Sequence, residues 1–314
     1  MAGGGGRDGP FTSDRSPEKL KELVRKAEDK AASAEFEAKL SDNLGELLSG
    51  YNGRDTELVT DRLSDLKRVL EGEIEGTLDQ LYGGSVAKHT YVDGLSDIDS
   101  LVLIDGTDLE DKSPHRVIEK LRNLLVKSNS DDLTITSGKM AVTVEYPDGM
   151  QIQLLPALRT DAGLAVPSSR HEGWSSIKPQ AFQSALTRRN EECGGKLVPA
   201  IKLAKAVIAT LPESQRLSGY HIESLAIAAF RGYDGPKTTT AMLPTFFEKA
   251  KDLVKAPIRD STGQSVHVDT YLGGENSQQR QSTSHVLDRL ARRMRNATAA
   301  GSIDQWLSMF ETEF

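Results

Sequence analysis

The chain has 314 residues, enough for two packed domains, and its 46 acidic residues outnumber its 39 lysines and arginines. The resulting formal net charge of -7 disfavours constitutive binding to nucleic acid, and the single cysteine, Cys193, excludes an internal disulfide or a multi-cysteine zinc site. No apolar run is long enough to span a membrane and no apolar signal region opens the chain, so we expect a cytoplasmic protein with no membrane partner.

Two helical patterns follow a polar start. Residues 1–15 are rich in glycine, and we expect a disordered tail because they offer little apolar surface to bury. Pro17 then favours a helix start, and helix-forming residues dominate the next stretch. After an Asn-Gly pair, apolar residues recur every three or four positions from Val59 to Leu81. This spacing predicts a long helix that reaches Gly83.

The pattern then changes to that of a mixed sheet. Residues 101–104 form an apolar run typical of a buried strand, and the Ser-Pro pair at 113–114 predicts the start of a helix. Three strand-like segments follow between residues 133 and 158, and a Pro-Asp-Gly turn signal at 147–149 separates the last two. From residue 179 onward the pattern is almost wholly helical.

These patterns predict an α+β protein with two lobes. Residues 16–165 would form a mixed-sheet domain with N-terminal helices, and residues 166–314 would form a helical lobe. We expect a cleft between the two lobes, which is where sites built from two domains commonly lie.

The stretch 83–99, GGSVAKHTYVDGLSDID, has the residues for binding phosphate and metal. Gly84 lets a backbone approach phosphate closely, and Ser85 adds a hydroxyl donor. Asp97 and Asp99 are two apart, so on a strand both carboxylates point to the same side, which suits a pair of divalent cations. A Gly-Gly-Ser triplet alone is usually a turn, and such aspartates alone are usually exposed acids. Their order, ahead of an apolar strand, favours a triphosphate and metal site.

The segment GGSVAKHTYVDGLSDIDSLVLI resembles the signature of the polymerase-β-like nucleotidyltransferases. Downstream, KLVPAIKLAKAVIATL and LSGYHIESLAIAAF resemble the helical lobe of the cyclic oligonucleotide synthases, the bacterial CD-NTases of CBASS anti-phage systems. Those enzymes are related to cyclic GMP-AMP synthase and oligoadenylate synthase. The resemblance covers roughly residues 55–310 and implies a bilobal fold with a mixed-sheet palm domain, a long N-terminal spine helix and a C-terminal helical lobe.

The resemblance also implies roles for the residues of the first motif. Gly84 and Ser85 would hold the donor triphosphate of a nucleotide, and Asp97 and Asp99 would bind two Mg²⁺ or Mn²⁺ ions.

Further roles fall on the helical lobe. A family lysine that contacts phosphate matches Lys205, with Lys202 as second choice, although either could lie on a solvated helix face. A Ser-Tyr pair that contacts phosphate and stacks on a nucleobase matches Ser218 and Tyr220, and Gly219 stands where many relatives have a second serine. The tyrosine could equally be a core residue.

The chain departs from the family at two positions. Relatives carry a third carboxylate where this chain has Gln153, and an amide neither carries charge nor readily deprotonates a hydroxyl. The hairpin turn should pair Glu145 with Gln151, which puts Glu145 on the face of Gln153 and makes it a candidate for the missing carboxylate, directly or through water. The alternative is an outward-facing strand glutamate. His89 is the second departure, because many relatives have glycine before Thr90.

The resemblance therefore implies an enzyme that joins nucleoside triphosphates, ATP among them, into a cyclic di- or oligonucleotide and releases pyrophosphate. Its product would act on an effector protein, and regulatory proteins are further expected partners. A linear transferase, such as an oligoadenylate synthase or an enzyme that nucleotidylates tRNA or antibiotics, stays open. So does a nucleotide-binding pseudoenzyme, which Gln153 supports and which the retention of Asp97 and Asp99 argues against.

Overall fold

The structure is a computed structural model, and it describes part of the chain. The described residues are 17–53, 55–76, 78–82, 89–92, 98–128, 133–161, 163–168, 172–258 and 268–311. The tail predicted at residues 1–15 lies outside them. None of the described helices combines the length and apolarity needed to cross a membrane.

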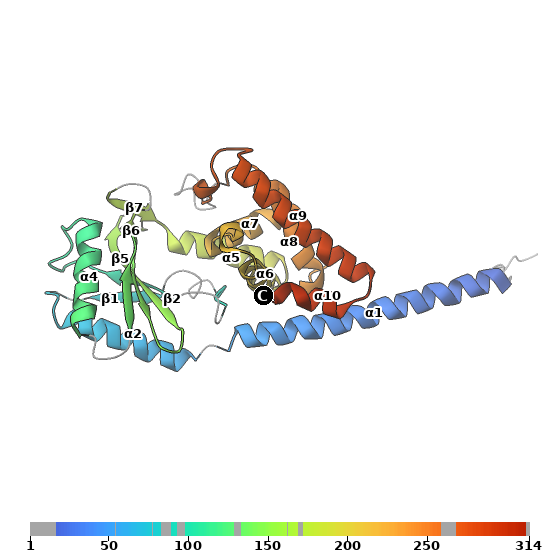
Figure 1. The fold of residues 1–314 in the computed structure, drawn as a ribbon, viewed down its shortest axis with the longest axis horizontal. Coiled ribbons are helices and arrows are strands. Elements are labelled where there is room, and N and C mark those ends of the chain that lie inside the picture. Colours follow the sequence, from blue (N-terminus) through green and yellow to red (C-terminus); the bar gives the residue numbers. More distant parts are fainter. Residues whose placement is uncertain are drawn as a thin grey trace, which may run out of the picture.

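Two lobes lie side by side along a pair of N-terminal helices (Figure 1). A sheet with its own helices forms one lobe and a bundle of helices forms the other. The predicted α+β, bilobal fold is thereby confirmed.

The two N-terminal helices serve different lobes. Helix α1 (Pro17–Tyr51) packs its second half on the helical lobe, where Leu40 and Leu44 are buried. Asp55 is the N-cap of helix α2 (Thr56–Glu71), and its carboxylate accepts a hydrogen bond from the backbone N of Leu58 at 2.9 Å. Its apolar stripe then enters the core of the sheet lobe.

The prediction that this second helix continues to Gly83 is wrong. Helix α2 ends at Glu71, where the backbone N of Gly72 caps it by donating to Arg68 O at 3.2 Å, and residues 79–82 form a strand instead. Ile74 and Leu78 still enter the same core as α2. Their spacing therefore reflects burial, which a turn and a strand can supply as well as a helix.

The sheet has seven strands and confirms the predicted strand segments. Its main path runs β1-β2-β5-β4-β3, and β6 joins β5 to β7. Only the pairing of β2 with β5 is parallel among the described strands. The strands are β1 (Asp79–Tyr82), β2 (Ile98–Leu103), β3 (Thr134–Ser137), β4 (Val142–Glu145), β5 (Gln151–Thr160), β6 (Gly163–Pro167) and β7 (Trp174–Ile177).

One face of this sheet is apolar and covered by helices α2 and α4 (Pro114–Ser128). From β2 and β5 it receives Ile98, Val102, Ile152 and Leu154. Side chains alternate along a strand, so Asp99, Leu101 and Gln153 point to the opposite face. Figure 1 shows the helical lobe on that opposite side of the sheet, away from α4.

The helical lobe is built around one apolar core that includes Phe246 and Trp306. It follows the sheet, which β6 and β7 carry to Ile177, beyond the division at residue 165; where the two domains divide stays a prediction. Its helices are α5 (Pro179–Glu192), α6 (Leu197–Ala209), α7 (Gly219–Ala229), α8 (Thr239–Leu253), α9 (Gln278–Ala299) and α10 (Ile303–Leu307).

A buried arginine ties the segment between α8 and α9 to this lobe. Arg280 Nη1 donates to Asp269 Oδ2 at 2.6 Å and to Val254 O at 3.0 Å, while its Nε donates to Gly273 O at 3.0 Å. Both side chains of the ion pair are fully buried. Burial alone would raise the pKa of Asp269, but its hydrogen bond with Arg280 holds that pKa below its usual value.

We predict that Arg280→Met destabilises the fold by about 3–5 kcal/mol, because it leaves the Asp269 carboxylate buried without its partner. The free energy of unfolding in urea measures the loss. Arg292→Met is the control, since it breaks an exposed ion pair with Asp288 and should cost less than about 1 kcal/mol. Equal losses in the two variants would contradict the prediction.

Candidate functional site

Polar side chains form a row across the face of the sheet that α2 and α4 leave uncovered. In the parallel pairing of β2 with β5, Asp99 lies opposite Gln153. In the antiparallel pairing of β5 with β4, Gln153 lies opposite Thr143. All three are half-buried. The row therefore places an amide and a hydroxyl directly beside the Asp99 carboxylate, and Thr143 is a member that sequence reasoning missed.

Glu145 lies on the same face, one step along the strand from this row. It pairs with Gln151, as the hairpin turn predicted. Its side chain is exposed. Thr143, not Glu145, is the residue directly across from Gln153, so a Glu145 carboxylate has to reach past one strand position to meet Asp99. Its role stays a prediction.

Three predicted site residues, Gly84, Ser85 and Asp97, lie outside the described residues. Among the residues that the structure does describe, histidine, cysteine, aspartate and glutamate nowhere gather in a group of three that could hold a metal. Asp99 offers one carboxylate and Gln153 one amide oxygen, which are the hard oxygen ligands that Mg²⁺ takes. This donor set fits a magnesium site that Asp97 would complete.

Lys205 lies inside a buried polar cluster that spans the two lobes. Its Nζ donates to Glu223 Oε1 at 2.9 Å and to the backbone O of Thr90, also at 2.9 Å. The Thr90 hydroxyl donates to the same Glu223 oxygen. The Lys205 side chain is 7% exposed and the Glu223 side chain 1%. We call these three residues the Thr90–Lys205–Glu223 cluster.

The cluster explains what Gly219 does at the start of α7. A Cβ atom at position 219 would lie 3.4 Å from Lys205 Nζ, at the edge of ordinary van der Waals contact. The glycine thus leaves the ammonium close to the first turn of α7, where backbone N–H groups make the helix end positive. Two positive charges in one place are unfavourable, and the Glu223 carboxylate offsets them.

The second candidate lysine also has a partner in the structure. Lys202 Nζ donates to the side-chain oxygen of Asn52, just after α1. Neither lysine therefore lies on a bare solvated helix face. Contact of either one with phosphate stays a prediction, and Lys205 is the one whose surroundings include the segment that leads to β2.

Ser218 and Tyr220 flank the start of α7. The Ser218 hydroxyl caps the helix by accepting from the backbone N of His221 at 3.3 Å. Tyr220 is 36% exposed, and its ring centroid lies 4.6 Å from that of Phe182 on α5. The tyrosine is thus no core residue, and part of its surface is open to solvent.

A buried histidine behind this helix start was not predicted to have a role. His221 Nδ1 lies 2.7 Å from Tyr271 Oη, and that oxygen accepts from the backbone N of Ser218 at 3.3 Å. The other ring nitrogen, Nε2, lies 3.7 Å from Asp269 Oδ2. The contacts join residues about fifty positions apart, so no local pattern could have found them.

His89 occupies an unusual backbone conformation. Its φ is 58°, in the left-handed region that glycine adopts without strain and other residues rarely enter. This explains physically why glycine is common at this position in the family that the motif resembles.

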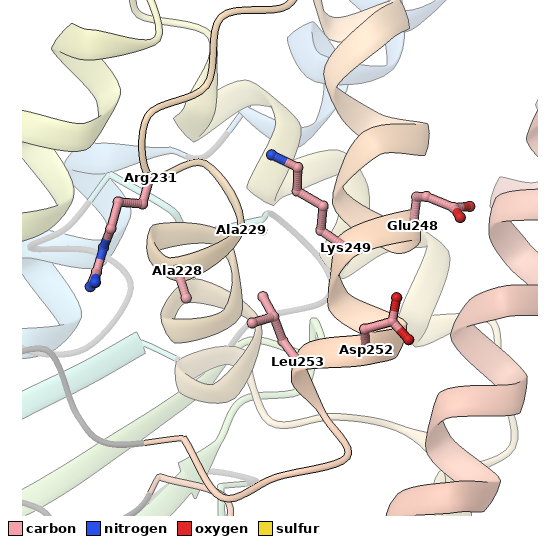
Figure 2. A pocket seen from close by; sticks show the side chains of 7 residues that line it. All are labelled: Ala228, Ala229, Arg231, Glu248, Lys249, Asp252 and Leu253. Atoms are coloured by element: carbon pink, nitrogen blue, oxygen red, sulfur yellow. The ribbon is translucent and has the colours of Figure 1, made fainter.

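Two hollows lie on the helical lobe. One of about 450 Å³ lies between the end of α7 and the second half of α8 (Figure 2). There Glu248 points toward α9, where it pairs with Arg295, and none of the predicted site residues lines the hollow. The other, of about 540 Å³, is bounded by Tyr271 and by serines and glutamines at the start of α9. Tyr271 places this second hollow next to Ser218.

Residues 39–190 match the family described as "Second Messenger Oligonucleotide or Dinucleotide Synthetase domain" (SMODS). No curated protein matches the chain in sequence.

Solved structures of CD-NTases share the fold. CdnG of Bradyrhizobium diazoefficiens, solved with GTP, is 17% identical with a TM-score of 0.62, over 80% of this chain and 88% of that one. Escherichia coli DncV in its 3′-deoxy GTP bound form is 12% identical with a TM-score of 0.62, over 95% and 90%. Vibrio cholerae DncV, a cyclic AMP-GMP synthase solved with a linear intermediate, is 11% identical with a TM-score of 0.61, over 94% and 89%.

We predict that the free energy of unfolding falls as the pH is lowered from 6.5 to about 4, because the buried His221 ring stays neutral over this range. Burial lowers the pKa of His221 from its usual 6.5 to about 4, a shift that Asp269 opposes and Arg280 supports. Below pH 6.5 the histidine of the unfolded chain is protonated, whereas the histidine of the folded chain stays neutral until about pH 4. The free energy of unfolding should therefore drop by up to about 1.4 kcal/mol per pH unit in this window.

Urea unfolding of the wild type and of His221→Gln at several pH values measures this dependence. The variant lacks the titrating ring, so its stability should vary less between pH 6.5 and about 4. Parallel profiles for the two proteins would show that the stability loss comes from carboxylates alone.

Proposed function

We propose that the chain is a nucleotidyltransferase that makes a cyclic di- or oligonucleotide, because residues 39–190 match the Second Messenger Oligonucleotide or Dinucleotide Synthetase domain and the chain shares the fold of solved CD-NTases. Its substrates are nucleoside triphosphates, ATP among them, and it releases pyrophosphate. The observation that carries the proposal is the place of Asp99. It lies in the uncovered polar row of the sheet, on the side toward the helical lobe that holds Lys205, Ser218 and Tyr220.

Residues of both lobes take part in binding the nucleotide. Gly84 and Ser85 bind the triphosphate, and the start of α7 adds the Ser218 hydroxyl and the Lys205 charge. The exposed part of Tyr220 offers a face for stacking of a nucleobase. A linear intermediate forms first, turns in the same site, and closes in a second transfer.

Asp97 and Asp99 would hold two Mg²⁺ or Mn²⁺ ions. When bound, such ions lower the pKa of the attacking hydroxyl and neutralise charge on the leaving pyrophosphate. Oxygen donors suit them, and the row of Asp99, Gln153 and Thr143 supplies oxygen donors only.

Glu145 is our candidate for the third carboxylate that Gln153 lacks. It shares the face of Asp99 and is exposed, so its carboxylate can extend along the strand or act through a water molecule. In this role it accepts the proton of the attacking hydroxyl.

A linear transferase is the second candidate. Gln153 favours it over a cyclase because an amide does not readily take the proton of an attacking hydroxyl. A site with weakened proton abstraction completes one transfer more readily than two. The same residue is the only support for a nucleotide-binding pseudoenzyme. We place the enzyme in the cytoplasm, in CBASS anti-phage signalling, with an effector protein that senses the product and with regulatory proteins.

The test is incubation of the purified protein with all four NTPs and Mg²⁺ or Mn²⁺, followed by phosphatase treatment and mass spectrometry. We expect a phosphatase-resistant product that Asp97→Asn/Asp99→Asn abolishes. A phosphatase-sensitive chain would establish the linear transferase. Bound nucleotide without any product would favour the pseudoenzyme.

We predict separate kinetic effects for the carboxylates of the sheet. Asp99→Asn should abolish turnover, because an amide holds a metal ion far more weakly than a carboxylate does. Glu145→Gln should lower kcat about 100-fold, which is the usual contribution of a general base. Glu71→Gln is the matched control, since it makes the same exchange at an exposed glutamate of α2, which covers the other face of the sheet, and should not lower kcat. Full turnover of Glu145→Gln would remove Glu145 from the mechanism.

A further inference from the structure

The Thr90–Lys205–Glu223 cluster joins two parts of the chain that the proposed reaction uses separately. Thr90 belongs to the segment between the Gly-Gly-Ser turn and Asp99, whereas Lys205 lies on α6 and Glu223 on α7. Thr90 and Glu223 are almost completely buried. A carboxylate is kept in such a place only when its charge is paired and its oxygens are hydrogen-bonded.

The hydrogen bonds of the cluster hold Thr90 by its side chain and by its backbone. Glu223 Oε1 accepts from the Thr90 hydroxyl and from Lys205 Nζ, and Nζ also donates to the Thr90 carbonyl. One carboxylate thus controls the position of an ammonium, a hydroxyl and a peptide group.

We propose that Glu223 is a positioning residue for nucleotidyl transfer. It keeps Thr90, which precedes Asp99 by nine positions in the sequence, fixed against α7. It also keeps the Lys205 ammonium at the start of α7. Both effects set the distance between the carboxylate in the sheet and the groups of the helical lobe, and this inference rests on the function proposed above. A displacement of catalytic groups by about 1 Å lowers the reaction rate by up to about 100-fold.

A purely structural role would predict a different result, and the chain offers a matched comparison. Thr240 is 7% exposed, and its hydroxyl donates to the Glu37 carboxylate at 3.2 Å, where α8 meets α1. It is therefore a second buried threonine bonded to a glutamate, away from the polar row of the sheet. Thr240→Val removes the same kind of hydrogen bond as Thr90→Val.

The experiment measures kcat, KM for each NTP, and the melting temperature in Thr90→Val, Thr90→Ser and Thr240→Val. We expect Thr90→Val to lower kcat by at least about tenfold while KM changes less than about threefold. Thr90→Ser keeps the hydroxyl and should retain kcat within about threefold, as should Thr240→Val. A Thr90→Val enzyme that keeps more than a tenth of the wild-type kcat overturns the proposal, and so does an equal loss in Thr240→Val.

Glu223→Gln covers the case in which Thr90→Val fails to fold. Its amide oxygen can accept the same two hydrogen bonds, but it no longer offsets the Lys205 charge, and we again expect at least about a tenfold loss in kcat. Retention of more than a tenth of kcat in this variant also overturns the proposal.

Wild-type turnover tests the proposed function, and the ratio of variant to wild type tests Glu223. If the wild type makes no product, hydrogen exchange still decides the inference. Amides at residues 89–92 should exchange at least about tenfold faster in Thr90→Val than in the wild type, because their anchor is lost. Unchanged exchange there overturns the proposal independently of any activity.

Discussion

A buried ammonium has to be neutralised where it lies, and in this protein that requirement connects the two lobes. Lys205 comes from the helical lobe, and its partners are a carboxylate of the same lobe and a peptide carbonyl of the sheet lobe. The hydrogen bond to Thr90 O cannot form unless Thr90 lies against α6 and α7. The relative placement of sheet and helices is thus set by polar contacts, in addition to apolar packing.

The polar row on the sheet differs from this buried, ion-paired cluster. Its members are half-buried and reach toward the side where the helical lobe lies, and only Asp99 among them carries a charge. An amide beside that carboxylate weakens the repulsion that a third acid would add. Gln153 therefore makes the sheet face easier to fold without metal, at the cost of a weaker electrostatic hold on cations when they bind.

Much of the sheet could be predicted because its signals are local. The apolar run of β2 and the Pro-Asp-Gly turn specify strands within a few residues, and the turn alone sets the pairing of Glu145 with Gln151. The end of α2 could not be predicted, since a buried turn and strand repeat apolar residues much as a helix does. The contact of Lys205 with Thr90 could not be predicted either, because the two residues lie 115 positions apart and no sequence spacing connects them.

Helix α1 has a consequence of its own. Its described side chains from residue 21 to residue 35 are all exposed, and contacts with the helical lobe begin only near Phe36. Most helical stability in proteins comes from tertiary packing, which these exposed side chains do not supply, and surface ion pairs such as Lys26 with Glu22 add only tenths of a kcal/mol. The first half of α1 is therefore expected to open without disturbing the core, while the second half should unfold only with the core. Figure 1 shows this half projecting past the bundle.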